Sequence, residues 1–267
     1  RITAARARSF ATRVLQAIDV PAADARVAAR LLVRTDLRGV RTHGLKLLPL
    51  YAARIESHGV NITPRIKRLK RASWGGVIDA DASLGQVGAS AALRIAVEAA
   101  NARGLGMCIC RNTSHVGALG PYLMQAVRGN AVLAMTNTAA SVAPPGGNFA
   151  AIGNNCIGFA APIRGAAALC LDMTTSYESW GKIRDRIERG ESLPPGVALA
   201  PDGSWATDPA VAVAHTVAAA LGGAKGFGLA MMIDIITGGL SGGELSPKLK
   251  LLRDVSAEPE GTCCAFV

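Results

Sequence analysis

The sequence predicts an α/β (α+β) fold, in which a helical N-terminal part precedes a part that alternates strands with helices. Up to about residue 57, apolar residues recur at spacings of three and four, the period of an amphipathic helix. After residue 75, short apolar runs alternate with longer alanine-rich segments, which is typical of a sheet covered by helices. Half of the 267 residues are hydrophobic, so the chain can bury one large core or two smaller ones.

Three helices are expected in the N-terminal part. The apolar periodicity covers residues 2–18, 22–34 and 47–57. Pro21 stands directly before the second segment, where its fixed backbone suits the start of a helix. Gly59 closes the third segment, as glycine often does at the C-terminal end of a helix.

A boundary between two lobes is expected near residues 60–72, because Pro64 imposes an extended link there. We therefore divide the chain into a helical lobe of residues 1–70 and a second lobe of residues 71–267. Within the second lobe, a helical excursion is expected near residues 178–215.

The second lobe should begin with alternating strands and helices. Strands are expected over residues 76–80, 107–110 and 131–135, and helices over residues 88–103 and 121–127. Residues 159–162 and 168–172 bracket a turn at Arg164-Gly165 and form a candidate hairpin. The charged segment 182–191 should be a surface helix.

The net charge of +10 favours an anionic partner, either nucleic acid or a small molecule. The run Arg65-Ile-Lys-Arg-Leu-Lys-Arg71 is basic, but Ile66 and Leu69 interrupt it as they would on a solvated element with one buried edge. Aromatic residues, which would stack on bases, make up only 4% of the chain. We therefore expect a small anionic substrate and no nucleic acid.

The six cysteines indicate a reducing compartment. They lie among apolar or small residues and show no paired framework of the kind that small secreted domains need. Cys108 and Cys110, followed by His115, lack the spacing of a zinc motif, so no metal site is expected. We find no signal peptide and no apolar run of about 18 residues, and expect a cytoplasmic protein without a membrane segment.

Two histidines stand in polar-His-Gly contexts that suit acid/base chemistry. These are Thr42-His43-Gly44 and Ser114-His115-Val116-Gly117. Histidine is the side chain whose unperturbed pKa lies nearest neutrality, so it can take up and release a proton at physiological pH. Arg38 lies close to His43 in sequence and adds an anion-binding group. The alternative is a capping or surface histidine.

A Gly-Gly-Ala-Lys-Gly-Phe-Gly loop at residues 222–228 is a candidate anion site. It lacks the Gly-Lys-Ser/Thr ending of a P-loop and the Gly-x-Gly-x-x-Gly spacing of a Rossmann fingerprint. An apolar helix is expected over residues 226–236, starting immediately after Lys225. Backbone N–H groups at Gly226, the positive helix end and the lysine would then all face one anion. The alternative is a packing turn with a solvated lysine.

Taken together, the motifs resemble those of the type-2 malate/L-lactate dehydrogenase family, which includes ureidoglycolate, sulfolactate and diketogulonate oxidoreductases. The resemblance runs along nearly the whole chain and rests on nine ordered motifs: Asp36-x-Arg-Gly-Val-x-Thr-His-Gly44, Asp79-Ala-Asp-Ala-Ser-Leu-Gly-Gln86, Asn112-Thr-Ser-His-Val-Gly117, Thr136-Asn-Thr138, Ala143-Pro-Pro-Gly-Gly147, Leu171-Asp-Met-Thr-Thr175, Gly181-Lys182, Thr207-Asp-Pro209 and Gly222-Gly-Ala-Lys-Gly-Phe-Gly228.

The resemblance implies a non-Rossmann NAD(P)-binding lobe with a mixed, largely antiparallel sheet and flanking helices. The helical lobe of residues 1–70 would serve the substrate and dimerisation, and residues 71–267 would bind the cofactor. The implied enzyme is a homodimer that uses NAD or NADP to interconvert a small 2-hydroxy acid and its 2-oxo acid by hydride transfer. An imino-acid reductase is the alternative substrate class within the family.

The resemblance also assigns roles to residues of this chain. His115 would be the acid/base group in one branch of the family, whereas His43, supported by Thr42 and Asp172, would have that role in another. The residues implied at the cofactor are Thr138, Asp172, Met173, Thr174, Lys225 and Gly226. Arg38 and Lys46 are the candidate cations for the substrate carboxylate.

This chain departs from the family pattern in three respects. Leu47 stands where many relatives carry an arginine that would hold the substrate carboxylate. Gly153-Asn-Asn-Cys156 replaces Gly-Thr-Asn-Pro, and the family's C-terminal segment is expected to be absent after Val267. A non-catalytic ligand- or cofactor-binding paralogue is therefore the second functional hypothesis. A triad hydrolase is disfavoured, because the chain has no Gly-x-Ser-x-Gly elbow.

Overall fold

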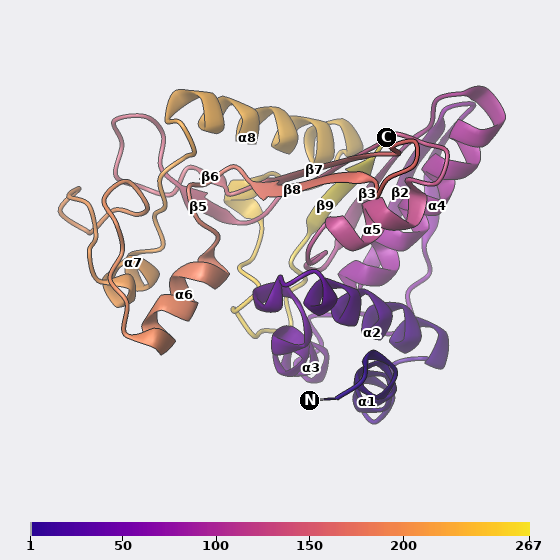
Figure 1. The fold of residues 1–267 in the computed structure, drawn as a ribbon, viewed down its shortest axis with the longest axis horizontal. Helices are drawn as coiled ribbons and strands as arrows, with labels where there is room; N and C mark the ends of the chain where they lie inside the picture. Colours follow the sequence, from indigo (N-terminus) through magenta and orange to yellow (C-terminus); the bar gives the residue numbers. More distant parts are fainter. Residues whose placement is uncertain (1) are drawn as a thin grey trace.

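A computed structural model describes residues 2–267, and a mixed seven-stranded sheet forms the centre of that part of the chain (Figure 1). The strands lie in the order β1 (Lys67–Ala72), β2 (Gly75–Ser83), β3 (Met107–Thr113), β9 (Thr262–Phe266), β4 (Val132–Thr136), β7 (Cys156–Ala161) and β8 (Leu169–Thr174). Only β2 and β3 pair in parallel. The predicted mixed, largely antiparallel sheet is confirmed.

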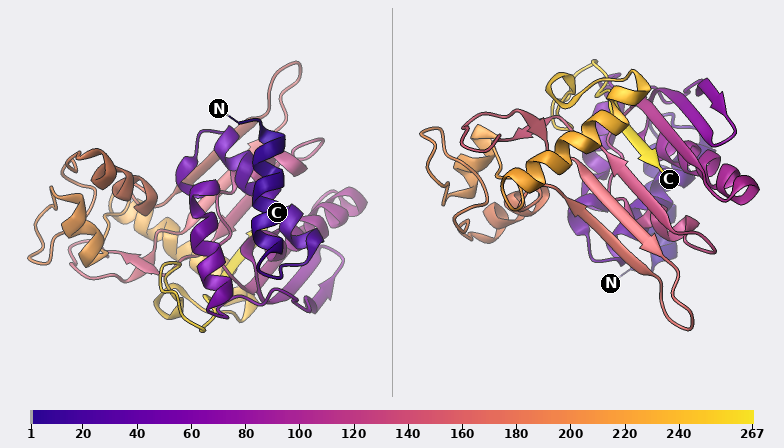
Figure 2. Two further views of the ribbon diagram at one scale, coloured as in Figure 1. Left: turned by 90° about the horizontal axis from the view of Figure 1, so that it is seen from below. Right: turned by 90° about the horizontal axis from the view of Figure 1, so that it is seen from above.

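Helices cover both faces of this sheet. The helices are α1 (Ala4–Gln16), α2 (Ala22–Leu37), α3 (Leu48–Glu56), α4 (Gly85–Arg103), α5 (Gly120–Ala126), α6 (Trp180–Arg189), α7 (Pro209–His215) and α8 (Ala224–Thr237). Figure 2 shows α8 lying across the strands on one face, and the N-terminal helices beyond the opposite face. A small second sheet pairs β5 (Ala140–Val142) with β6 (Ile152–Gly153).

The alternation of side chains along β3 explains why both faces need a helical cover. Cys108 and Cys110 point into a core shared with α4 and α5, whereas Ile109 between them points into a core shared with Ile233 of α8. Because successive residues of a strand face opposite sides of the sheet, an unbroken apolar run indicates burial on both faces. The prediction of a buried strand at residues 107–110 is confirmed.

The structure moves one predicted boundary and shows which element the basic run forms. The helix expected over residues 226–236 begins at Ala224, so Lys225 lies inside the first turn of α8 and not before it. The basic run at residues 65–71 forms the edge strand β1, whose side chains are almost all exposed. Lysine and arginine on an edge strand oppose edge-to-edge association, which gives this run a structural role.

The predicted hairpin is confirmed. β7 and β8 pair antiparallel from Cys156 opposite Thr174 to Ala161 opposite Leu169. Gly165 in the connecting turn has φ of 72°, a left-handed conformation that glycine adopts at little cost. Beyond β8, α6 and α7 pack around a small core of their own that includes Ile183.

The core of the N-terminal helices is connected to the sheet core, and the division into lobes at residue 70 stays a prediction. Leu31 of α2 belongs to the sheet core, and Leu84, just before α4, belongs to the core of the N-terminal helices. The N-terminal helices therefore share apolar contacts with the sheet. The contact is direct, since α2 packs against both α4 and α5.

The segment of residues 249–260, which we call the strap, is held against α3 by Arg54. This arginine is fully buried and donates hydrogen bonds to three backbone carbonyls of the strap, those of Asp254, Ser256 and Glu258. Its Nε lies 3.8 Å from the carboxylate of Glu260. A buried guanidinium with this many acceptors fixes the strap in one place, because every displaced carbonyl would be left unpaired.

Replacing Arg54 by methionine should destabilise the fold by about 3–5 kcal/mol, since it leaves the strap carbonyls and the buried Glu260 without their partner. Urea unfolding would measure the change. Arg94→Met is the matched control, because Arg94 forms an exposed ion pair with Glu98 on one helix. That control should change stability by at most about 0.5 kcal/mol. Equal destabilisation by the two substitutions would contradict the role of Arg54 in holding the strap.

Candidate functional site

A cavity of about 570 Å³ lies between the sheet, η1 (Arg41–His43), the start of α6 and the strap. It brings together seven of the residues predicted for the site: Thr42, His43, His115, Thr138, Asp172, Met173 and Thr174. These come from segments that are far apart in sequence. The cavity is the candidate active site, and its volume is in the range of ordinary ligand pockets.

His115 follows β3 and is held by a hydrogen bond to a tyrosine. The hydroxyl of Tyr51 lies 2.8 Å from His115 Nδ1, and Gln86 Nε2 donates to the same hydroxyl over 3.2 Å. Burial, the nearby His43 and the charge of Arg253 lower the pKa of His115 to about 3. The imidazole is therefore neutral at physiological pH, the form that can accept a proton.

His43 lies in η1 on the facing wall, with its ring centroid 5.7 Å from that of His115. Its Nδ1 is 2.9 Å from the hydroxyl of the preceding residue, Thr42. Burial also lowers the pKa of His43. Both predicted histidines thus face one cavity, each oriented by a hydroxyl group at Nδ1.

Asp172 was predicted to support His43, but its carboxylate has other partners. Its carboxylate accepts a 2.7 Å hydrogen bond from the backbone N–H of Gly120, at the first residue of α5, and Arg38 lies beside it. Burial raises the pKa of Asp172, and the hydrogen bond and Arg38 oppose that rise. Among the described residues, no hydrogen bond joins Asp172 to His43.

The wall that carries the predicted cofactor residues is built on two asparagines. Asn155 is fully buried and accepts the backbone N–H of Thr138, while it donates to the carbonyl of Ala230 in α8. Asn154 accepts the hydroxyl of Thr138 through its side chain and that of Thr174 through its carbonyl. The side chains and backbone of Asn154 and Asn155 therefore hold this wall in place.

Lys225 and Gly226 lie in the first turn of α8 and do not line the cavity, whereas Leu221, just before them, does. Gly222 and Gly223 both have φ near +60°, and no side chain caps this helix start. Gly226 packs directly against the carbonyl of Leu221. The result is a helix start whose backbone N–H groups no side chain caps, which we call the cradle, and the role of Lys225 and Gly226 at the cofactor stays a prediction.

The two cations predicted for the substrate lie outside the cavity lining. Lys46 forms ion pairs of 2.7 Å with Asp185 and Glu188 of α6, which raise its pKa. Arg38 lies beside Asp172. Leu47 is buried and lines the cavity with an apolar surface.

Two other arginines line the cavity, and sequence analysis missed both. Arg184 comes from α6 and Arg253 from the strap. The charge of Arg253 lowers the pKa of both His115 and Arg184, which places the three groups in one electrostatic environment. Arg253 reaches the cavity only because Arg54 anchors the strap, so no local motif could reveal it. Gln86 ends one of the quoted motifs and could have been chosen from it.

The comparisons identify the family. The family model described as malate/L-lactate dehydrogenase matches residues 2–267. The chain belongs to the malate/L-lactate dehydrogenase family. Malate dehydrogenase from Pyrococcus horikoshii is 37% identical over 275 residues, which cover 100% of this chain and 75% of that protein. Its solved structure superposes with a TM-score of 0.90 and 33% identity, covering 100% of this chain and 74% of that one.

Two further relatives carry a cofactor in their names. Ureidoglycolate dehydrogenase (NAD(+)) from Escherichia coli O157:H7 is 34% identical, over 82% of this chain and 62% of its own length. (2R)-3-sulfolactate dehydrogenase (NADP(+)) from Chromohalobacter salexigens is 35% identical, over 88% of this chain and 71% of its own length. The prediction of a dehydrogenase that acts on 2-hydroxy acids is confirmed.

Three other features of residues 2–267 bear on earlier expectations. All six cysteines carry free thiols. No group of three or more His, Cys, Asp or Glu side chains in the described part could hold a metal ion. None of the helices found there is long and apolar enough to cross a membrane.

The depressed pKa of His115 predicts acid sensitivity. Below its ordinary pKa of 6.5 the unfolded chain binds a proton there, whereas the folded protein does not until about pH 3. Stability contributed by this group is therefore complete above pH 6.5 and is lost as the pH falls below it. Urea unfolding from about pH 7 to about pH 4 should show a steeper loss for wild type than for His115→Asn. If the stability of wild type and of His115→Asn fell equally with pH, the lowered pKa of His115 would be contradicted.

Proposed function

We propose that the protein is an NAD(P)-dependent oxidoreductase that interconverts a small 2-hydroxy acid and its 2-oxo acid, with a cavity histidine as the acid/base group. The observation that carries the proposal is the pair of neutral, hydroxyl-oriented histidines facing one cavity that Arg184 and Arg253 also line. Family membership supports the reaction class.

His115 is the proposed acid/base group, because its environment is the more constrained. Tyr51, whose hydroxyl accepts a hydrogen bond from Gln86, holds the ring at Nδ1, and with the ring proton on Nδ1 donated to the tyrosine oxygen, Nε2 has the lone pair that accepts the substrate proton. In the oxidation direction neutral His115 accepts the hydroxyl proton, and in reduction the imidazolium returns it. His43 stands opposite as the second candidate, supported by Thr42.

Arg253 is the proposed partner of the substrate carboxylate, with Arg184 beside it. Neither forms an ion pair with an acidic residue in the described part of the chain, whereas Lys46 has two. A carboxylate bound to Arg253 would offset the charge that lowers the pKa of His115. Substrate binding would thereby raise that pKa towards the range useful for proton transfer.

The residues near the cavity fit a nicotinamide dinucleotide, which supplies or accepts the hydride when bound. Thr138, Met173 and Thr174 would line its path, and the cradle at Lys225 and Gly226 would hold phosphate oxygens. Trp180 lines the same cavity, and its buried indole N–H has no hydrogen-bond partner among residues 2–267. NAD and NADP are both open, since relatives named for each are similar to this chain.

A homodimer and a cytoplasmic location stay part of the proposal. The outward stripe of α8 supports dimerisation, because Met231, Met232 and Ile235 on it are each about half exposed. A helix that is apolar on all sides is usually covered on all sides. The free thiols agree with a reducing compartment.

Loss of the acid/base group should abolish most turnover. Initial rates of NADH and NADPH oxidation would be measured with pyruvate, oxaloacetate, 2-oxobutyrate, sulfopyruvate and a cyclic imino acid, and the reverse reaction with ureidoglycolate. We expect His115→Asn to lose about a hundredfold or more in kcat while still binding cofactor. If His43→Asn alone has that effect, the roles are exchanged. Cofactor binding with no turnover by wild type would favour the binding paralogue.

Removing the proposed carboxylate partner should weaken substrate binding more than it slows the chemistry. Arg253→Met is expected to raise KM about ten- to a hundredfold, the usual effect of losing a charged hydrogen bond. Lys46→Met is the matched control, since its ammonium is paired with Asp185 and Glu188. If Lys46→Met raised KM more than Arg253→Met did, Lys46 and not Arg253 would be the partner of the substrate carboxylate.

A further inference from the structure

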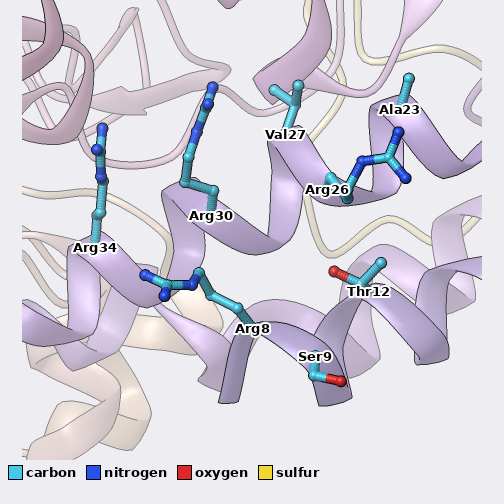
Figure 3. Close-up of a pocket in the computed structure, with 8 residues that line it drawn as sticks. All are labelled: Arg8, Ser9, Thr12, Ala23, Arg26, Val27, Arg30 and Arg34. Atoms are coloured by element: carbon cyan, nitrogen blue, oxygen red, sulfur yellow. The ribbon is translucent and has the colours of Figure 1, made fainter. Parts of the chain in front are cut away.

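A second cavity, of about 550 Å³, lies between α1 and α2 and shares no lining residue with the candidate active site. We call it the arginine cleft. It is lined by Arg8, Ser9, Thr12, Ala23, Arg26, Val27, Arg30 and Arg34 (Figure 3). Half of these residues are arginines, and none is acidic.

The arginines that α2 contributes to the arginine cleft are spaced in a way that destabilises the helix. Arg26, Arg30 and Arg34 follow one another at intervals of four along α2, so their side chains emerge from one face, about 6 Å apart along the axis. Like charges at this spacing repel each other and weaken a helix. Figure 3 shows Arg30 and Arg34 side by side on α2, and Arg8 on the neighbouring α1.

The repulsion is not relieved within the protein. Every ion pair formed by residues 2–267 lies elsewhere, so all four arginines lack an acidic partner. Burial and the charges of Arg30, Arg8 and Arg128 lower the pKa of Arg34. The basic side chains of β1 are exposed, as are the four arginines of the cleft, but they line neither cavity.

We propose that the arginine cleft binds a linear polyphosphate group, either free or carried by a nucleotide. Guanidinium groups pair with phosphate oxygens through two parallel hydrogen bonds, and successive arginines along α2 offer several such pairs to one chain of phosphates. The hydroxyls of Ser9 and Thr12 add donors on the α1 side. The cleft is open to solvent, and its volume suits a small molecule. This inference does not depend on the proposed function.

Titration calorimetry with inorganic tripolyphosphate tests the proposal. The cleft variant Arg30→Gln/Arg34→Gln should lose about tenfold or more in affinity. The control variant Arg68→Gln/Arg71→Gln removes the same charge from β1 and should bind as wild type does. Equal losses in the two variants, or no binding to wild type, would overturn the proposal.

Thermal unfolding provides a second measurement that is independent of affinity. Because the arginines repel each other, the cleft variant should unfold at a higher temperature than wild type without ligand. Tripolyphosphate should raise the Tm of wild type and leave that of the cleft variant unchanged. A cleft variant that loses Tm and is still stabilised by tripolyphosphate would contradict the site.

Further ligands separate the sources of the phosphate chain. Equal affinity for tripolyphosphate and ATP supports recognition of the phosphates alone, and tighter binding of ATP that is lost in the cleft variant supports a nucleotide. Polyglutamate represents an acidic protein partner. If polyglutamate binds the cleft more tightly than either phosphate ligand, the small-anion proposal is wrong.

Discussion

The position of β9 between β3 and β4 is the constraint on which the rest of the structure depends. β1, β2 and β3 form one half of the sheet, and β4, β7 and β8 form the other. β9 alone joins the two halves through its pairing with β3 and β4. The strap that precedes β9 must therefore pass the carboxyl end of β3, where His115 lies, and Arg54 fixes the path that it takes.

This arrangement links stability to the chemistry of the cavity. The backbone that leads into β9 brings Arg253 to the cavity wall and buries Glu260 behind it. Burial raises the pKa of Glu260 to about 7, against the opposing effects of Arg54 and of the His115 backbone. His115 and Glu260 thus lie in one buried region that disfavours charge on both, and each is closer to neutral than it would be in water.

Most of the individual helices and strands were predictable, because they follow local patterns. The apolar run at residues 107–110 and the turn at Arg164-Gly165 identified a buried strand and a hairpin without any tertiary information. The start of α8 was missed by two residues, because three glycines conceal where the helix begins. β9 was not predicted, since Thr262-Cys-Cys-Ala-Phe266 is short and its burial comes from partners far away in sequence.

The candidate site was predictable only where chemistry coincides with a motif. The two histidines stand beside glycines and were found from that context, and the structure places both in one cavity. Lys46 was predicted to bind the substrate because it neighbours Leu47, but its ammonium forms ion pairs with Asp185 and Glu188 of α6. Arg253 lies in a segment without periodicity, and Arg54 brings it to the cavity through contacts about 200 positions away in sequence.

The central place of β9 has a consequence for how the chain folds. Thr136 in β4 and Cys263 in β9 are hydrogen-bonded across a separation of 127 positions, so the sheet closes through contacts that are distant along the chain. Contacts of this kind form slowly, because the loop between them must be ordered first. During synthesis on the ribosome, β3 and β4 would emerge with exposed edges long before their shared neighbour. The nascent chain would therefore pass through a state in which the two halves of the sheet are present but β9, the strand that joins them, is not yet in place.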